Sequence, residues 1–163
     1  MNIIIHGLDE LVKDATNAGL EVKPLMRGML NNSVSEITAR TRKLAPHATG
    51  TLQRSIMPER NYPVARVKVN APYGSYVENG TRPHWPPIGA IAAWAAKKGI
   101  GDAKGYRATG KGSTPFLIAR AISKRGTKAQ PFWKPGIEQS VPLIDREMRL
   151  VADRLFLRIR GKA

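Results

Sequence analysis

Two long stretches of this chain repeat apolar residues every three or four positions, the spacing of one helix face. The first covers residues 22–44 and carries Pro24 in its first turn, where a proline costs no hydrogen bond. It ends before Pro46, because the residue that precedes a proline disfavours helical geometry. The second is a C-terminal helix with the apolar stripe Ile137, Val141, Ile144, Met148, Val151, Leu155 and Ile159. We expect both stripes to face a core.

Three shorter segments also show helical patterns. We expect helices over residues 8–19, 88–98 and 114–125, with Gly99 and Gly126 just past the ends of the last two. Thr114 and Pro115 fit the N-cap and first position of the last helix. Trp94, on the helix of residues 88–98, is expected in the core.

Four short segments have the composition of strands, namely residues 2–5, 52–59, 65–69 and 73–78. In the third, apolar and polar residues alternate, which predicts a sheet with one solvated face. The pattern predicts an α+β fold in a single domain, 1–163. A twisted antiparallel sheet of about four strands packs against the helix of residues 22–44 and the C-terminal helix.

Charge divides the chain unevenly. Its 163 residues include 27 Lys and Arg against 12 Asp and Glu, a net charge of +15. Residues 60–137 hold fourteen of the cations and only Glu78 and Asp102 in opposition. We interpret residues 82–130 as a basic helix–loop–helix insert. Such a block indicates DNA, RNA or an acidic protein surface as a partner, or merely a solvated face that keeps the protein soluble.

Within this insert, the Gly- and Lys-rich residues 99–113 predict a mobile loop. Its cations would face acidic surfaces of neighbouring proteins or DNA. The basic residues that we expect to face a partner are Lys97, Lys98, Lys104, Arg107, Lys111, Arg125 and Lys128.

Several kinds of chemistry find no support in the sequence. The absence of cysteine excludes a disulfide scaffold and thiol catalysis, and is typical of a reducing compartment. Residues 105–111 imitate a phosphate-binding loop, but Gly112 stands where that loop needs Ser or Thr. The three histidines lie far apart, and no two of Glu59, Glu78 and Asp102 are close in sequence. We therefore expect no catalytic residues, no cofactor and no metal.

The N-terminal residues and the apolar runs also bear on location. The start has no basic region and no small-residue cleavage site, so we do not expect a signal peptide. The longest apolar runs fall short of the roughly 20 residues that span a bilayer, so no membrane partner is expected.

Four residues are candidates for anchors or interfaces: Glu78, Trp85, Phe132 and Trp133. Pro131 and Pro135 hold Phe132 and Trp133 in an extended stretch. Those rings either bury an irregular segment inside the chain or form a hot spot for a partner. Glu78 lies in a basic neighbourhood, so we expect it to pair with an Arg or Lys of its own chain or of a neighbouring subunit.

Four sequence elements occur in one order along the chain: residues 43–46 (Lys-Leu-Ala-Pro), 49–56 (Thr-Gly-Thr-Leu-Gln-Arg-Ser-Ile), 71–81 (Ala-Pro-Tyr-Gly-Ser-Tyr-Val-Glu-Asn-Gly-Thr) and 131–135 (Pro-Phe-Trp-Lys-Pro). Together they resemble the neck or tail-completion proteins of tailed bacteriophages, a group related to minor tail protein Z. The resemblance covers nearly the whole chain. The chain departs from the family's pattern at His47-Ala48 and in the long excursion of residues 85–128.

This resemblance implies a structural virion protein without enzymatic activity that joins the DNA-filled head to the tail. It implies a ring-shaped homo-oligomer, expected as a hexamer, between head-closure or adaptor proteins and tail-terminator or tail-tube proteins. Phage DNA would pass through the lumen. The protein would be found in the virion, and in the host cytoplasm during assembly. The alternative function is a free, basic nucleic-acid-binding protein.

Overall fold

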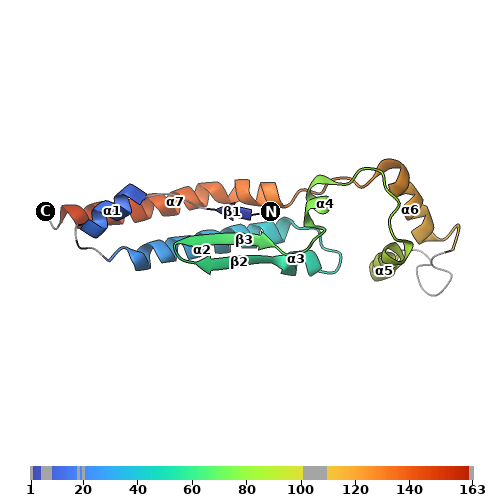
Figure 1. The fold of residues 1–163 in the computed structure, drawn as a ribbon, viewed down its shortest axis with the longest axis horizontal. Coiled ribbons are helices and arrows are strands. Elements are labelled where there is room, and N and C mark those ends of the chain that lie inside the picture. The colour runs from blue at the N-terminus through green and yellow to red at the C-terminus, as the bar shows by residue number, and fades with distance from the viewer. Residues whose placement is uncertain (1, 5–8, 18, 20, 101–109, 162–163) are drawn as a thin grey trace.

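The computed structural model describes residues 2–4, 9–17, 19, 21–100 and 110–161, which form an elongated molecule that is mostly helical (Figure 1). Over these residues the helices are α1 (Asp9–Asn17), α2 (Lys23–Leu44), α3 (Thr51–Ser55), α4 (Gly74–Asn79), α5 (Ile88–Lys98), α6 (Thr114–Arg125) and α7 (Trp133–Arg160). The strands are β1 (Asn2–Ile4), β2 (Ile56–Asn61) and β3 (Val64–Val69). We call residues 82–130 the arm and the rest of the chain the body.

Helices α2 and α7 run side by side in opposite directions along the body (Figure 1). Both helices were predicted, and α2 buries a stripe that includes Met26, Leu30, Val34 and Ile37. Three of its buried residues are polar, and two of those hydroxyls donate to the preceding turn, as Thr38 does to the Val34 carbonyl at 2.6 Å. The α2 stripe is therefore a mixture of apolar residues and small polar ones.

The extended stretch expected between Pro131 and Pro135 is wrong, because α7 begins at Trp133 and Pro135 lies in its first turn, where a proline costs no hydrogen bond. Of the stripe expected on α7, Val151 and Leu155 are buried, whereas Val141 is 54% exposed.

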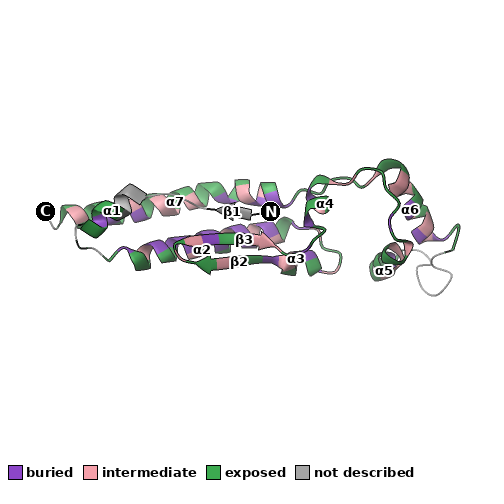
Figure 2. Ribbon diagram, viewed as in Figure 1, coloured by how far each residue is buried: buried purple, intermediate pink, exposed green. Residues whose placement is uncertain are grey.

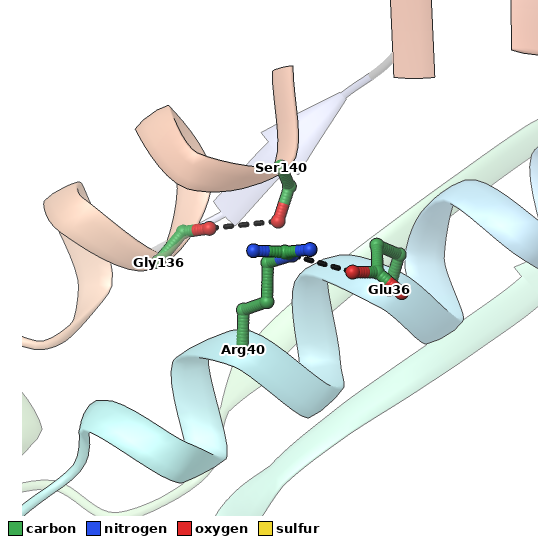
Figure 3. Close-up of polar contacts among 4 residues, drawn as sticks. All are labelled: Glu36, Arg40, Gly136 and Ser140. Atoms are coloured by element: carbon green, nitrogen blue, oxygen red, sulfur yellow. Dashed lines mark hydrogen bonds and ion pairs between the residues drawn. The ribbon is translucent and has the colours of Figure 1, made fainter. Parts of the chain in front are cut away.

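Gly136 allows α7 to approach α2 closely. A Cβ at this position would lie 2.6 Å from Thr41 Oγ1 and 2.9 Å from Thr41 Cα, which is closer than real Cβ atoms come. Thr41 Oγ1 itself is buried and has no hydrogen-bond partner among the described residues. Next to this contact, Ser140 Oγ donates to the Gly136 carbonyl at 2.7 Å, and the Arg40 side chain reaches toward α7 while it pairs with Glu36 (Figure 3). The two helices thus meet through small side chains.

The sheet is antiparallel with the strand order β1-β3-β2. The β2–β3 hairpin packs against the long helices, with Ile56 and Val67 fully buried in the same core as Phe132 and Leu155. Along β3, Ala65 and Val67 are buried whereas Arg66 is exposed, which confirms the predicted one-sided alternation. The α+β class is therefore confirmed at the level of a hairpin on two long helices.

Two of the four predicted strands are wrong in whole or in part. Residues 73–78 lie mostly in the helix α4, where Gly74 and Glu78 are buried four positions apart, the spacing of a helix face. Residues 52–55 belong to α3, and the strand starts only at Ile56. Alternation over five or six residues fits a short helix as well as a strand. The sheet therefore has three strands over the described residues, instead of about four.

The arm extends beyond the end of the body at which α7 begins (Figure 1). It consists of α5 and α6, which match the predicted helices and pack against each other. Ser113, and not Thr114, is the N-cap of α6, since its Oγ accepts from the Phe116 N–H at 3.4 Å. The buried residues of the arm are small, among them Ala95, Pro115 and Ala119, whereas Figure 2 shows that most of its surface is exposed.

Body and arm are joined by two chain segments that pair with each other. Thr81 N donates to the Thr127 carbonyl at 3.1 Å, and Thr127 N donates back to the Thr81 carbonyl at 3.3 Å. Gly126 has a φ of 72°, and a Cβ there would overlap the Thr81 carbonyl oxygen. We call this paired segment, residues 80–82 and 126–128, the stalk.

Candidate functional site

The four sequence elements meet at one end of the body. Gln53 Nε2 donates to the carbonyls of Arg42 at 3.1 Å and Ala45 at 3.2 Å, and so satisfies acceptors that the end of α2 leaves free. Arg42 Nε donates in turn to the Ile56 carbonyl at 2.9 Å. The bond from Gln53 to Ala45 ties the second element to the first, and Arg42, the residue just before the first element, holds the same two segments together.

Glu78 ties the third element to the fourth. Its Oε2 accepts from the backbone N–H groups of Phe132 at 2.7 Å and Trp133 at 2.8 Å, and its Oε1 accepts from Lys134 N at 3.0 Å. A helix leaves its first N–H groups without partners inside the helix and favours negative charge near them, so a carboxylate suits the start of α7. Glu78 is 8% exposed and is therefore an internal cap.

The ion pair expected at Glu78 is not formed by any described residue of the chain. Both carboxylate oxygens bind backbone N–H groups instead, because α4 delivers the side chain to a helix terminus. Net charge along a sequence does not reveal where helix termini lie in space. The basic neighbourhood of Glu78 was thus a poor guide to its partner.

Phe132 and Trp133 form an internal anchor at this junction. Phe132 is fully buried and Trp133 is 7% exposed, both in the main core. Trp85, by contrast, is 52% exposed in the arm and meets Phe116 edge to face, with ring centroids 5.7 Å apart. Of the three aromatic candidates, Trp85 is therefore the one whose side chain is exposed to solvent.

A pocket of about 460 Å³ opens between the body and the arm beside this junction. Leu52, Tyr73 and Val77 line it from the body, and Trp94 and Lys98 line it from α5. Lys98 Nζ donates to the His47 carbonyl at 3.0 Å, so α5 touches the body here. None of the described residues lining the pocket is acidic, so it suits an apolar or anionic group and lacks a carboxylate for acid–base chemistry.

The expectation that Trp94 lies in the core is wrong. Its side chain is 39% exposed at the rim of this pocket, whereas its neighbour Ala95 is fully buried. Adjacent helix residues point about 100° apart, so the small residue occupies the packed face and the ring lies beside it.

The arm carries charge that its own residues do not balance. Its described residues, 82–100 and 110–130, contain eight exposed cations and no carboxylate: Arg82, Lys97, Lys98, Lys111, Arg120, Lys124, Arg125 and Lys128. The ion pairs seen among the described residues all lie in the body. This density of unopposed positive charge on an exposed surface attracts polyanions or acidic protein surfaces.

The structure gathers most of the basic residues expected to face a partner. Lys97, Lys98, Lys111, Arg125 and Lys128 are exposed on the arm, whereas Lys104 and Arg107 lie outside the described residues. The expected mobile loop of residues 99–113 falls largely in the same undescribed stretch.

Sequence reasoning did not single out Arg120 and Lys124 on α6, although both counted toward the charge excess. Their spacing of four on a predicted helix was the available signal, because it places both on one face. Tyr73 and Trp94 at the pocket were missed as well, and no sequence signal pairs them.

No group of three His, Asp or Glu side chains among the described residues is placed to hold a metal ion. No helix in that part of the chain has the length and hydropathy to cross a membrane.

Comparison with known proteins gives no relative on which to build. The chain matches none of the models of known protein families, no curated protein and no solved structure.

Proposed function

We propose that this chain is a structural protein of the neck or tail-completion complex of a tailed bacteriophage, and that copies of it form a ring that joins head to tail. The observation that carries the proposal is the projecting arm. Its described residues include eight exposed cations without a carboxylate and bury little core of their own, so its faces are available to neighbouring proteins. The four sequence elements that prompted the resemblance also support the proposal, because hydrogen bonds at the base of that arm join the first element to the second and the third to the fourth.

A non-catalytic role agrees with how the carboxylates of the central region are used. Glu59 pairs with Lys68 at 2.5 Å, and Glu78 caps α7. Both therefore have structural partners.

The test is electron microscopy of phage particles assembled without this protein. We expect separate filled heads and tails, because the piece that joins them is missing. Complete particles of normal infectivity would contradict the proposal. The control is expression of the intact chain in trans, which should restore joined particles.

A second candidate function is binding of nucleic acid, favoured by the same eight cations. If the arm binds the phosphate backbone, log K for duplex DNA falls linearly with log salt concentration, by about 0.9 per phosphate neutralised. Changing Arg120 and Lys124 to Ala should then lower that slope by roughly two. Binding without salt dependence would contradict this function and leave the structural role in place.

A further inference from the structure

A groove of about 420 Å³ lies between α2 and α7 on the body. Ala39, Leu143 and Ile144 supply its apolar surface, and Leu143 is 37% exposed. Glu36 and Glu147 line it as well. Glu36 is paired with Arg40, whereas Glu147 accepts only from the Asn32 side chain, at 3.2 Å, among the described contacts. Arg60 donates to Ser35 Oγ at 2.8 Å at the edge of the groove. The groove is thus apolar, and Glu147 is the lining carboxylate that has no cation partner among the described residues.

The outward face of α6 has the complementary character. Leu117, Arg120 and Lys124 recur at spacings of three and four, so they share one face of the helix. Leu117 is 52% exposed, and both cations are exposed. The opposite face holds the buried residues Pro115 and Ala119. An exposed leucine that shares its helix face with two cations matches an apolar groove that carries two carboxylates, of which Glu147 has no cation partner among the described residues.

The arm cannot fill the groove of its own chain in this structure. Leu143 lies ten residues into α7, about 15 Å from the start of that helix, and the arm extends away from the body at that start (Figure 1). The occupant that the charges and the geometry favour is therefore the arm of another copy.

We propose that the α6 face of one copy docks into the α2–α7 groove of the next copy. The two surfaces differ, so the contact is head-to-tail, and repetition generates a ring or a filament instead of a closed dimer. Lys124 and Arg120 pair with Glu147 and Glu36, and Leu117 covers Leu143. This proposal rests on the proposed function, in that it supplies the contact from which such a ring is built.

Cysteine cross-linking tests the contact directly, because the natural chain has no cysteine. The variant with both Leu117→Cys and Leu143→Cys should give a ladder of disulfide-linked trimers and larger species on mild oxidation. Each single variant alone should stop at dimers. A mixture of the two single variants, with distinguishable tags, should give the mixed dimer as its main product.

The matched control pairs Leu117→Cys with Leu157→Cys. Leu157 is an exposed leucine of α7, 67% exposed, and lies two heptads beyond Leu143. A ladder from the first pair and not from the control supports the proposal. The proposal is overturned if both double variants give equal ladders of disulfide-linked species, or if the Leu117→Cys, Leu143→Cys variant gives no ladder. This holds whether the wild-type chain sediments as an oligomer or as a monomer.

Charge exchange gives a second readout that does not depend on new thiols. Arg120→Glu with Lys124→Glu, or Glu36→Lys with Glu147→Lys, should each weaken self-association at least roughly tenfold, as disruption of close interfacial charge pairs does. The chain with all four changes should recover most of the loss. Circular dichroism of each variant checks that it is folded, and a quadruple variant no better than its parents overturns the pairing.

The outcomes separate this proposal from the function on which it rests. If particles assembled without the protein give separate heads and tails but cross-linking gives no ladder, the proposed function stands and the α6–groove contact is wrong. If cross-linking gives a ladder but particles that lack the protein are normal, the contact stands and the proposed function is wrong.

Discussion

The body and the arm differ in what holds them together. The largest fully buried side chains of the body include Phe132, Ile37, Ile56 and Leu155, whereas the arm buries mainly alanine, proline and serine. Acidic residues in the body pair with its cations, but the described arm has none. Burial of large apolar side chains stabilises a fold far more than burial of small ones. The body therefore holds most of the stabilising apolar burial, and the arm presents mainly exposed surface.

The largest expected effect is a difference in stability loss between two tryptophan substitutions, one in the body and one in the arm. Trp133→Ala should lower the free energy of unfolding of the body by about 3–5 kcal/mol, because it empties a buried site. Trp94→Ala, at the exposed rim of the pocket, should cost less than about 1 kcal/mol. Urea denaturation followed by circular dichroism measures both. Equal losses would show that the arm contributes to the core as the body does.

The carboxylate at the start of α7 should give the next largest effect. Glu78→Gln keeps the shape of the side chain but removes the charge that three N–H groups bind, so we expect a loss of about 2–3 kcal/mol. The control is Glu59→Gln, which breaks a half-exposed ion pair and should cost under about 1 kcal/mol. Thermal unfolding at neutral pH compares the two. A similar small loss in both would mean that Glu78 is dispensable as a cap.

The stalk offers a change that should act on the arm alone. Gly126→Ala forces a left-handed backbone on alanine and pushes its Cβ into the Thr81 carbonyl, at a cost of about 1–3 kcal/mol. Amide hydrogen exchange should then quicken in α5 and α6 by roughly tenfold or more, while the melting of the body stays unchanged. Gly89→Ala in α5, where a Cβ meets nothing within 4 Å, is the control and should leave exchange no faster. A body that melts earlier in the Gly126 variant would show that the two regions are coupled.

The smallest expected effect is a gain. Thr41→Val removes a buried hydroxyl that has no partner in the described part of the chain and keeps the branched shape, so it should stabilise the body by about 1 kcal/mol. Thr38→Val is the matched control on the same helix. It removes a hydroxyl that donates to the Val34 carbonyl, and should be neutral or slightly destabilising. A destabilised Thr41 variant would indicate that its hydroxyl is hydrogen-bonded after all.

The secondary structure of an element could be predicted from the sequence when its apolar pattern extended over several turns. Helices α2 and α7 repeat their apolar residues over many turns, so their type was predictable, although α7 begins at Trp133, within the stretch that was expected to be extended. The six residues of α4 span less than two turns, and their alternation fitted a strand equally well. Short elements are decided by tertiary contacts, here by the bonds from Glu78 to α7.

In the candidate site, too, features that lie close together in the sequence could be predicted, and pairings between distant residues could not. The basic arm was visible because charge is a property of composition, and it needs no knowledge of the fold. The cap on α7 and the groove between α2 and α7 each join residues more than fifty positions apart, and local patterns carry no information at that range. Pairings of this kind emerge only once the helices are placed in space.

The hydrogen-bonded pair of Thr81 and Thr127 has a consequence for how this chain could change over generations. The pair brings the two ends of a 45-residue excursion within 3.3 Å of each other, in the geometry of an antiparallel bridge. A two-residue turn such as Asn-Gly could close that gap, as it does in a tight hairpin. The excursion can therefore change in length or sequence while this bridge stays in place, and the contacts of α5 with the body, through Trp94 and Lys98, are what such a change would alter. Such a layout lets the exposed surface of the arm diverge while the core of the body is inherited intact.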